Sequence, residues 1–111
     1  MQKPNIFTNI PSELSNELFE DILKNDCFKI ERIISNEHSS PEGFWYDQDQ
    51  DEWVIVLQGS AALLFKGETQ PIELSAGDYL MIKAHQHHRV EWTAKNTIWL
   101  AIHWFPQTIR Q

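Results

Sequence analysis

A carboxylate and a histidine-rich segment are the residues of this chain that could do chemistry together. Glu52 opens the apolar run 53–57, which stops at Gly59. A second run begins at Gly77 and leads into the histidine-containing segment 85–88. Carboxylate oxygens and imidazole nitrogens can hold a divalent metal ion, or they can move a proton on a bound molecule. Either chemistry requires a fold that brings these two runs together.

The elements that must position these residues are short strands divided by turn residues. From Cys27 onward, apolar residues alternate with polar ones or form short blocks, and glycines or polar clusters separate the blocks. This spacing predicts an all-β barrel or sandwich. The predicted strands are 27–34, 44–47, 52–58, 60–66, 69–74, 79–83, 88–93 and 97–105.

The N-terminal region has a different pattern. Leu14, Leu18 and Ile22 recur at four-residue spacing after a Pro-Ser pair, which predicts a short amphipathic helix over residues 13–25. We therefore expect an N-terminal extension, residues 1–26, whose helix packs on a barrel domain formed by residues 27–111.

Composition excludes several classes of partner. The chain has 16 acidic and 9 basic residues, a net charge of -7, and no cluster of Lys and Arg that could follow a phosphate backbone. We expect no nucleic-acid partner and no membrane partner, because no apolar run reaches membrane-spanning length. A single cysteine rules out an intrachain disulfide, so the expected location is the cytoplasm.

Two predicted strands are apolar on both faces, namely 52–58 and 97–105. A strand in a small barrel would normally leave one face in water, so two apolar faces need two covers. The N-terminal helix could supply one cover and a second copy of the chain the other. The sequence therefore predicts a homodimer.

Over residues 44–105 the chain resembles a small single-domain cupin. Glu52 and Gly59, with six residues between them, match the end of the first cupin motif, and Gly77 and His88, with ten residues between them, match the second. The resemblance implies a cupin-type double-stranded β-helix, or jelly-roll barrel, with one interior pocket. It also implies a divalent metal ion, Mn²⁺, Fe²⁺ or Zn²⁺, at that pocket.

The chain departs from the cupin pattern at the metal ligands. The two histidines that precede the glutamate in the first motif are absent, and either Tyr46 and Gln48 or Trp45 and Asp47 stand in their places. The set implied by the resemblance is then Gln48, Glu52 and His88. It is richer in oxygen than usual and would suit Mn²⁺, Fe²⁺ or Mg²⁺ better than Zn²⁺.

A second arrangement stays open, in which imidazoles supply more of the ligands. If His85, His88 and His103 converge with Asp47 or Glu52, Zn²⁺ or Fe²⁺ becomes plausible. The apolar strand 97–105 does not reveal which way His103 faces. The further pocket candidates are Tyr46, Asp47, His85, Trp92 and His103.

Two functions fit these residues. The first is a metal-dependent enzyme acting on a small organic molecule, with Tyr46 or His85 handling a proton. The second is a non-catalytic module that binds or senses a small molecule without a metal. The sequence does not choose a reaction, because the fold alone does not specify one.

Overall fold

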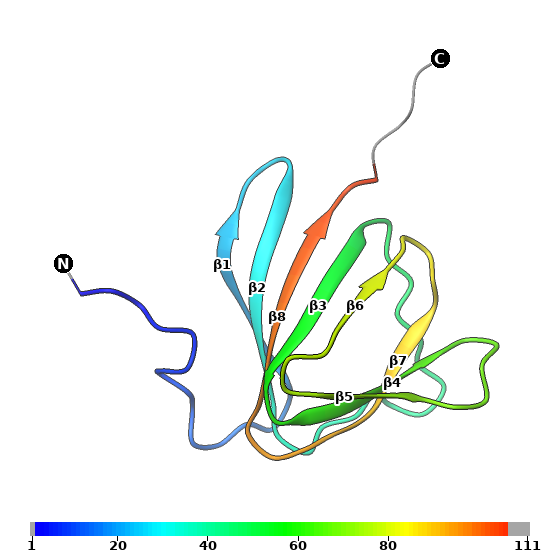
Figure 1. Cartoon of the computed structure of the whole chain (residues 1–111), viewed down its shortest axis with the longest axis horizontal. Coiled ribbons are helices and arrows are strands. Elements are labelled where there is room, and N and C mark those ends of the chain that lie inside the picture. The colour runs from blue at the N-terminus through cyan, green and yellow to red at the C-terminus, as the bar shows by residue number, and fades with distance from the viewer. Residues whose placement is uncertain (1, 107–111) are drawn as a thin grey trace.

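The computed structural model describes residues 2–106, which form two antiparallel sheets (Figure 1). The larger sheet has the strand order β1-β2-β8-β3-β6, and the smaller has the order β5-β4-β7. The strands are β1 (Leu18–Lys24), β2 (Phe28–Ser35), β3 (Asp51–Gln58), β4 (Ser60–Phe65), β5 (Ile72–Ser75), β6 (Tyr79–Ile82), β7 (His88–Thr93) and β8 (Thr97–Trp104).

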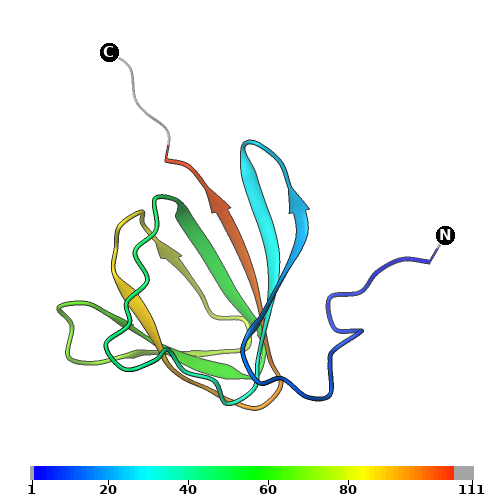
Figure 2. The ribbon, with the colours of Figure 1, turned by 180° about the vertical axis from the view of Figure 1, so that it is seen from behind.

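The two sheets meet at one end of the molecule and diverge toward the other. Figures 1 and 2 show β1, β2, β8, β3 and β6 side by side in the larger sheet, and the smaller sheet of β5, β4 and β7 meeting it at the lower end of both views. Their inner faces enclose one core, because successive side chains of a strand point to opposite faces. This core is made of Ile33, Val54, Val56, Ala61, Leu63, Phe65, Leu74, Ile82, Val90, Trp99 and Ala101.

The predicted all-β jelly-roll architecture is confirmed, with shifts at two of the expected strands. The segment 44–47 forms only an isolated bridge between Tyr46 and His88, and the predicted strand 69–74 is present as the shorter β5. Within residues 2–106 no helix is long and apolar enough to cross a membrane.

The predicted N-terminal helix is wrong. The second half of that segment is β1, which pairs antiparallel with β2 from Leu18 opposite Ile34 to Lys24 opposite Lys29. The four-residue spacing of apolar side chains fits a helix, but pairing with β2 satisfies the backbone groups and puts Phe19 on the inner face. Tertiary pairing therefore overrides the local pattern. The division of the chain at residue 26 stays a prediction.

Gly59 makes the corner at which the chain leaves the larger sheet and enters the smaller one. Its φ is +84°, in the left-handed region that glycine adopts at little cost. A Cβ at this position would lie 2.4 Å from the Thr97 hydroxyl oxygen and 2.8 Å from the Thr97 Cα. Thr97 is itself fully buried and starts β8, so it has no room to move aside.

We predict that Gly59→Ala destabilises the fold by about 2 kcal/mol or more beyond Gly67→Ala. Gly67 has a φ of +96°, but a Cβ there would have no neighbour within 4 Å. Both variants therefore have the backbone strain of a positive φ, but only Gly59→Ala adds a clash with Thr97. Urea unfolding of both variants measures the difference, and equal stability would show that the corner tolerates a methyl group.

Candidate functional site

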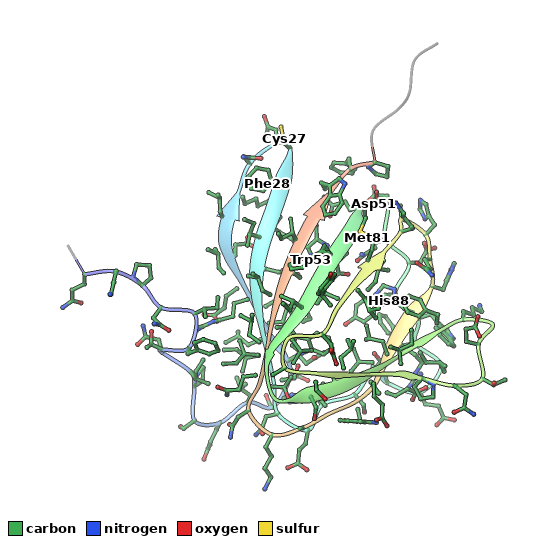
Figure 3. The ribbon with its side chains drawn as sticks, in the orientation of Figure 1. Cys27, Phe28, Asp51, Trp53, Met81 and His88 are labelled. Atoms are coloured by element: carbon green, nitrogen blue, oxygen red, sulfur yellow. The ribbon has the colours of Figure 1, made fainter. Side chains whose placement is uncertain are left out.

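A cavity of about 290 Å³ lies between the two sheets. Apolar side chains of the core and polar side chains from both sheets line it. Figure 3 shows one of them, His88, at the start of β7. The lining residues are Glu17, Phe19, Lys29, Glu31, Ile33, Tyr46, Gln48, Glu52, Val54, Leu63, Ile82, His88, Val90, Trp99 and His103.

Strand register places the polar residues of the larger sheet beside one another. Lys29 of β2 lies opposite His103 of β8, which in turn lies opposite Glu52 of β3. Glu52 and His103 are both buried, with exposed fractions of 7% and 6%. The facing of His103, which the sequence leaves open, is therefore inward.

Glu31 and His103 form a buried hydrogen-bonded pair that sequence reasoning missed. The His103 Nε2 donates to Glu31 Oε1 at 2.7 Å, and Lys29 Nζ lies 3.5 Å from Glu31 Oε2. Burial by itself would raise the pKa of Glu31, but the hydrogen bond and charge of His103, together with Lys29, outweigh it and lower that pKa below its ordinary value. Glu31 is thus held as a carboxylate.

Only the pairing of β2 with β8 could have identified Glu31 as a site residue. In the sequence it is one of several charged residues that alternate with apolar ones in the strand, and nothing marks it as inward. Glu17 and Lys29 also line the cavity without a sequence signal.

The second cluster centres on Glu52 and contains the three residues of the predicted metal set. Gln48 Nε2 donates to Glu52 Oε1 at 3.0 Å, and His88 Nε2 lies 4.0 Å from the same oxygen. The other carboxylate oxygen, Oε2, is 3.8 Å from His103 Nε2. The structure therefore brings Gln48, Glu52 and His88 together at the cavity wall.

The orientation of His88 is set by its backbone contact. Its Nδ1 lies 2.9 Å from the carbonyl oxygen of Gln86, and a carbonyl only accepts, so Nδ1 carries the proton. Nε2 of the neutral ring is left with a lone pair on the side of Glu52. Tyr46 stacks on this ring with centroids 5.3 Å apart, and the tilted ring of Phe65 has its centroid 6.0 Å away, so the imidazole contacts two aromatic rings.

Tyr46 keeps its phenol proton at neutral pH. Burial raises the pKa of Tyr46, and the negative charges of Glu17, Glu52 and Glu31 raise it further. The cavity thus contains a protonated phenol beside an imidazole with a free nitrogen.

Asp47 and His85 do not line the cavity. They form an exposed cluster with His87 on the loops beside it, in which Asp47 lies 2.8 Å from His85 Nδ1 and 3.4 Å from His87 Nε2. The hydrogen bond from His85 lowers the pKa of Asp47. The backbone N–H of His85 also donates to the Gln48 carbonyl at 2.7 Å, so this cluster anchors the loop that carries Gln48.

Trp92 does not line the cavity either, contrary to prediction. The pairing of β4 with β7 shifts between Ala62 and Leu63, so that Leu63 lies opposite Val90 but Ala62 lies opposite Trp92. This bulge breaks the simple alternation that would have put Trp92 on the same face as His88. Trp92 is 40% exposed as a result.

Comparison with known proteins agrees with this geometry. The cupin domain family matches residues 32–103. The chain belongs to the cupin family. No curated protein gives a match.

Solved structures of other cupins superpose on the whole domain. A protein from Ralstonia eutropha JMP134, described as a "putative mannose-6-phosphate isomerase", is 44% identical, with a TM-score of 0.90 over 96% of this chain and 100% of that one. A cupin superfamily protein from Desulfitobacterium hafniense DCB-2 is 21% identical, with a TM-score of 0.77 over 96% and 94% of the two chains. A cupin from Methanocaldococcus jannaschii with a double-stranded β-helix fold is 10% identical, with a TM-score of 0.67 over 88% and 87%.

The donors at the cavity do not fit a tight metal site as they are arranged. Among residues 2–106 no three His, Cys, Asp or Glu side chains are grouped so that they could hold a metal ion. Of the predicted set, Gln48 turns its NH₂ group, which cannot coordinate a cation, toward Glu52. His103 donates its Nε2 proton to Glu31.

We predict that Glu31→Gln lowers the free energy of unfolding by about 1–3 kcal/mol at pH 7. The pKa of Glu31 is depressed in the folded state, so its contribution is present above the unfolded pKa of about 4.3 and is lost as the pH falls through the folded value. Urea unfolding at pH 7 and near pH 2.5, well below the unfolded pKa, checks this, with the exposed Glu73→Gln on β5 as a control. A deficit that is the same at both pH values would contradict the assignment.

Proposed function

We propose that this cupin binds a small hydroxy-carbonyl compound in the cavity and isomerises it by proton transfer, with His88 as the base. The observation that carries the proposal is the orientation of His88, whose Nδ1 donates to the Gln86 carbonyl, so that in the neutral ring the lone pair is on Nε2, beside Glu52 at the cavity. A general base must present an unprotonated atom to the substrate.

The reaction needs only a base and an acid. His88 Nε2 removes a proton from the carbon next to the carbonyl, and the C–H electron pair becomes a carbon–carbon double bond while the carbonyl oxygen takes the Tyr46 phenol proton. The neighbouring hydroxyl then returns a proton to the phenolate and becomes the new carbonyl. His88 gives its proton to the former carbonyl carbon, so no oxidant, reductant or water is consumed.

Glu52 supports this role electrostatically. At 4.0 Å from Nε2, its carboxylate favours the imidazolium that forms when His88 accepts a proton. The name of the Ralstonia eutropha protein also supports an isomerisation, since that relative is 44% identical over nearly the whole chain.

A binding module is the second candidate. Gln48, Glu52 and His103 offer several polar contacts among apolar side chains, which is the usual composition of a small-molecule site. Ligand binding without any proton exchange would favour this function over catalysis.

A divalent ion at Gln48, Glu52 and His88 stays a prediction. To coordinate it, Gln48 would have to turn its amide oxygen toward the ion, and the ion would then polarise a ligand carbonyl as a Lewis acid. Elemental analysis of protein purified without chelator or added metal tests this set, with Glu52→Ala expected to lose whatever is bound.

We also propose that the outer face of the larger sheet forms a homodimer contact. Cross-strand neighbours Ile30, Ile102, Trp53 and Met81 make an apolar row across this face, and Figure 3 shows Trp53 and Met81 on the neighbouring strands β3 and β6. At one end of the sheet, Arg32 of β2 donates to the carbonyls of N-terminal residues 6, 8 and 9. Apolar faces of this kind are usually covered by a partner.

The catalytic prediction concerns His88. We expect wild-type protein to incorporate deuterium next to the carbonyl of at least one sugar in a panel of aldoses and ketoses in D₂O, and His88→Gln to slow this by about 100-fold or more. Proton NMR follows the exchange, and His87→Gln, a neighbouring imidazole outside the cavity lining, serves as a control. Equal rates in wild type and His88→Gln would remove His88 as the base.

The dimer prediction concerns Met81. We expect light scattering to give twice the chain mass of 13.1 kDa for wild type and a monomer for Met81→Lys, because a charge would be buried in the contact. Ile72→Lys is the matched control, since Ile72 is 41% exposed and Met81 38%, but Ile72 lies on the other sheet. A wild-type monomer at micromolar concentration would contradict the proposal.

A further inference from the structure

The cavity carries more negative than positive charge. Three carboxylates line it, from Glu17, Glu31 and Glu52, against a single cationic side chain, Lys29. Lys29 is already paired with Glu31. The imidazoles of His88 and His103 do not reverse this balance when they are neutral. A ligand that enters therefore meets an electronegative wall.

The carboxylates differ in how far the protein satisfies them. Glu17 accepts a hydrogen bond from the Ser35 hydroxyl, and Glu31 is bound by His103 and Lys29. Glu52 accepts a bond only at Oε1, from Gln48, among residues 2–106.

The second oxygen of Glu52 is open to a ligand. Oε2 lies 3.8 Å from His103 Nε2, which is beyond hydrogen-bond distance, and the side chain is 10% exposed. Oε2 is not among the fully buried unpartnered atoms of residues 2–106, so it borders the cavity and can accept a hydrogen bond from a ligand there. The open acceptor at Oε2 therefore indicates where the ligand donates.

Three aromatic side chains also line the cavity. They are Phe19, Tyr46 and Trp99. The faces of such rings are electron-rich and attract organic cations, above all ammonium groups, when water is excluded. Carboxylates combined with aromatic rings form a surface that favours a cation and repels an anion.

We propose that the ligand presents a protonated amine to Glu52, and that compounds carrying a phosphate or carboxylate are disfavoured. This rests on the proposed function, in which the cavity is the ligand site, and adds the charge class of the ligand. An ammonium group would donate to Oε2 of Glu52 and face the aromatic rings. A phosphate dianion in the same place would lie among Glu17, Glu31 and Glu52.

Three probes with the same ring test the proposal: glucosamine, glucose and glucose 6-phosphate. Calorimetric titration is done in the presence of a chelator, so that no divalent ion competes for Glu52. We expect glucosamine to bind about tenfold or more tightly than glucose, the scale of one charge-assisted hydrogen bond. Glucose 6-phosphate should bind more weakly than glucose.

Variants of Glu52 test whether its carboxylate causes the preference for glucosamine over glucose. Glu52→Gln should bring the ratio of glucosamine to glucose affinity close to one, whereas Glu52→Asp, which keeps the charge, should retain a preference for the amine. Glu73→Gln, an exposed carboxylate on β5, should leave the ratio unchanged. Thermal unfolding followed by circular dichroism identifies any variant that has not folded.

The outcomes separate this inference from the proposed function. Tightest binding of glucose 6-phosphate, equal binding of all three probes, or no binding of any would overturn the charge class. Deuterium exchange that depends on His88 would still support isomerisation in that case. An amine preference lost in Glu52→Gln, without any exchange, would support the charge class and remove catalysis.

Discussion

The register of β2, β8 and β3 is the constraint on which the site depends. It places Lys29, His103 and Glu52 in one cross-strand row that faces the cavity. Because side chains alternate between the faces of a strand, a slip of one residue would turn these groups outward and bring apolar neighbours inward. The hydrophobic core below the row opposes such a slip, since it would expose Val54 and Trp99.

Charge pairing within the row decides which groups remain available to a ligand. His103 and Lys29 satisfy Glu31, so that carboxylate has a structural role. Glu52 is less completely paired, and His88 is oriented by a backbone carbonyl rather than by another side chain. The same low-polarity surroundings that make an unpaired group costly also make it reactive toward a ligand. Proton transfer and recognition of an amine both use these less satisfied groups.

The pattern of apolar and turn residues along the sequence predicted those features that are decided by residues close together in the chain. The glycine corner at Gly59, the inward Glu52 and the start of β7 at His88 follow from apolar runs bounded by turn residues. The helix prediction failed because the spacing of Leu14, Leu18 and Ile22 is compatible with a helix, whereas the segment pairs instead with β2, which follows it after the short turn of residues 25–27. Local propensity is weak enough for such pairing to override it.

The sequence by itself determined the all-β class and the strands that carry Glu52 and His88, because strand periodicity and turn chemistry act over a few residues. Only the tertiary structure decided that His103 faces inward, that Glu31 is its partner and that a bulge turns Trp92 outward. These outcomes depend on which strands pair and in what register. That choice is made by packing across the whole barrel, where residues 72 positions apart come into contact.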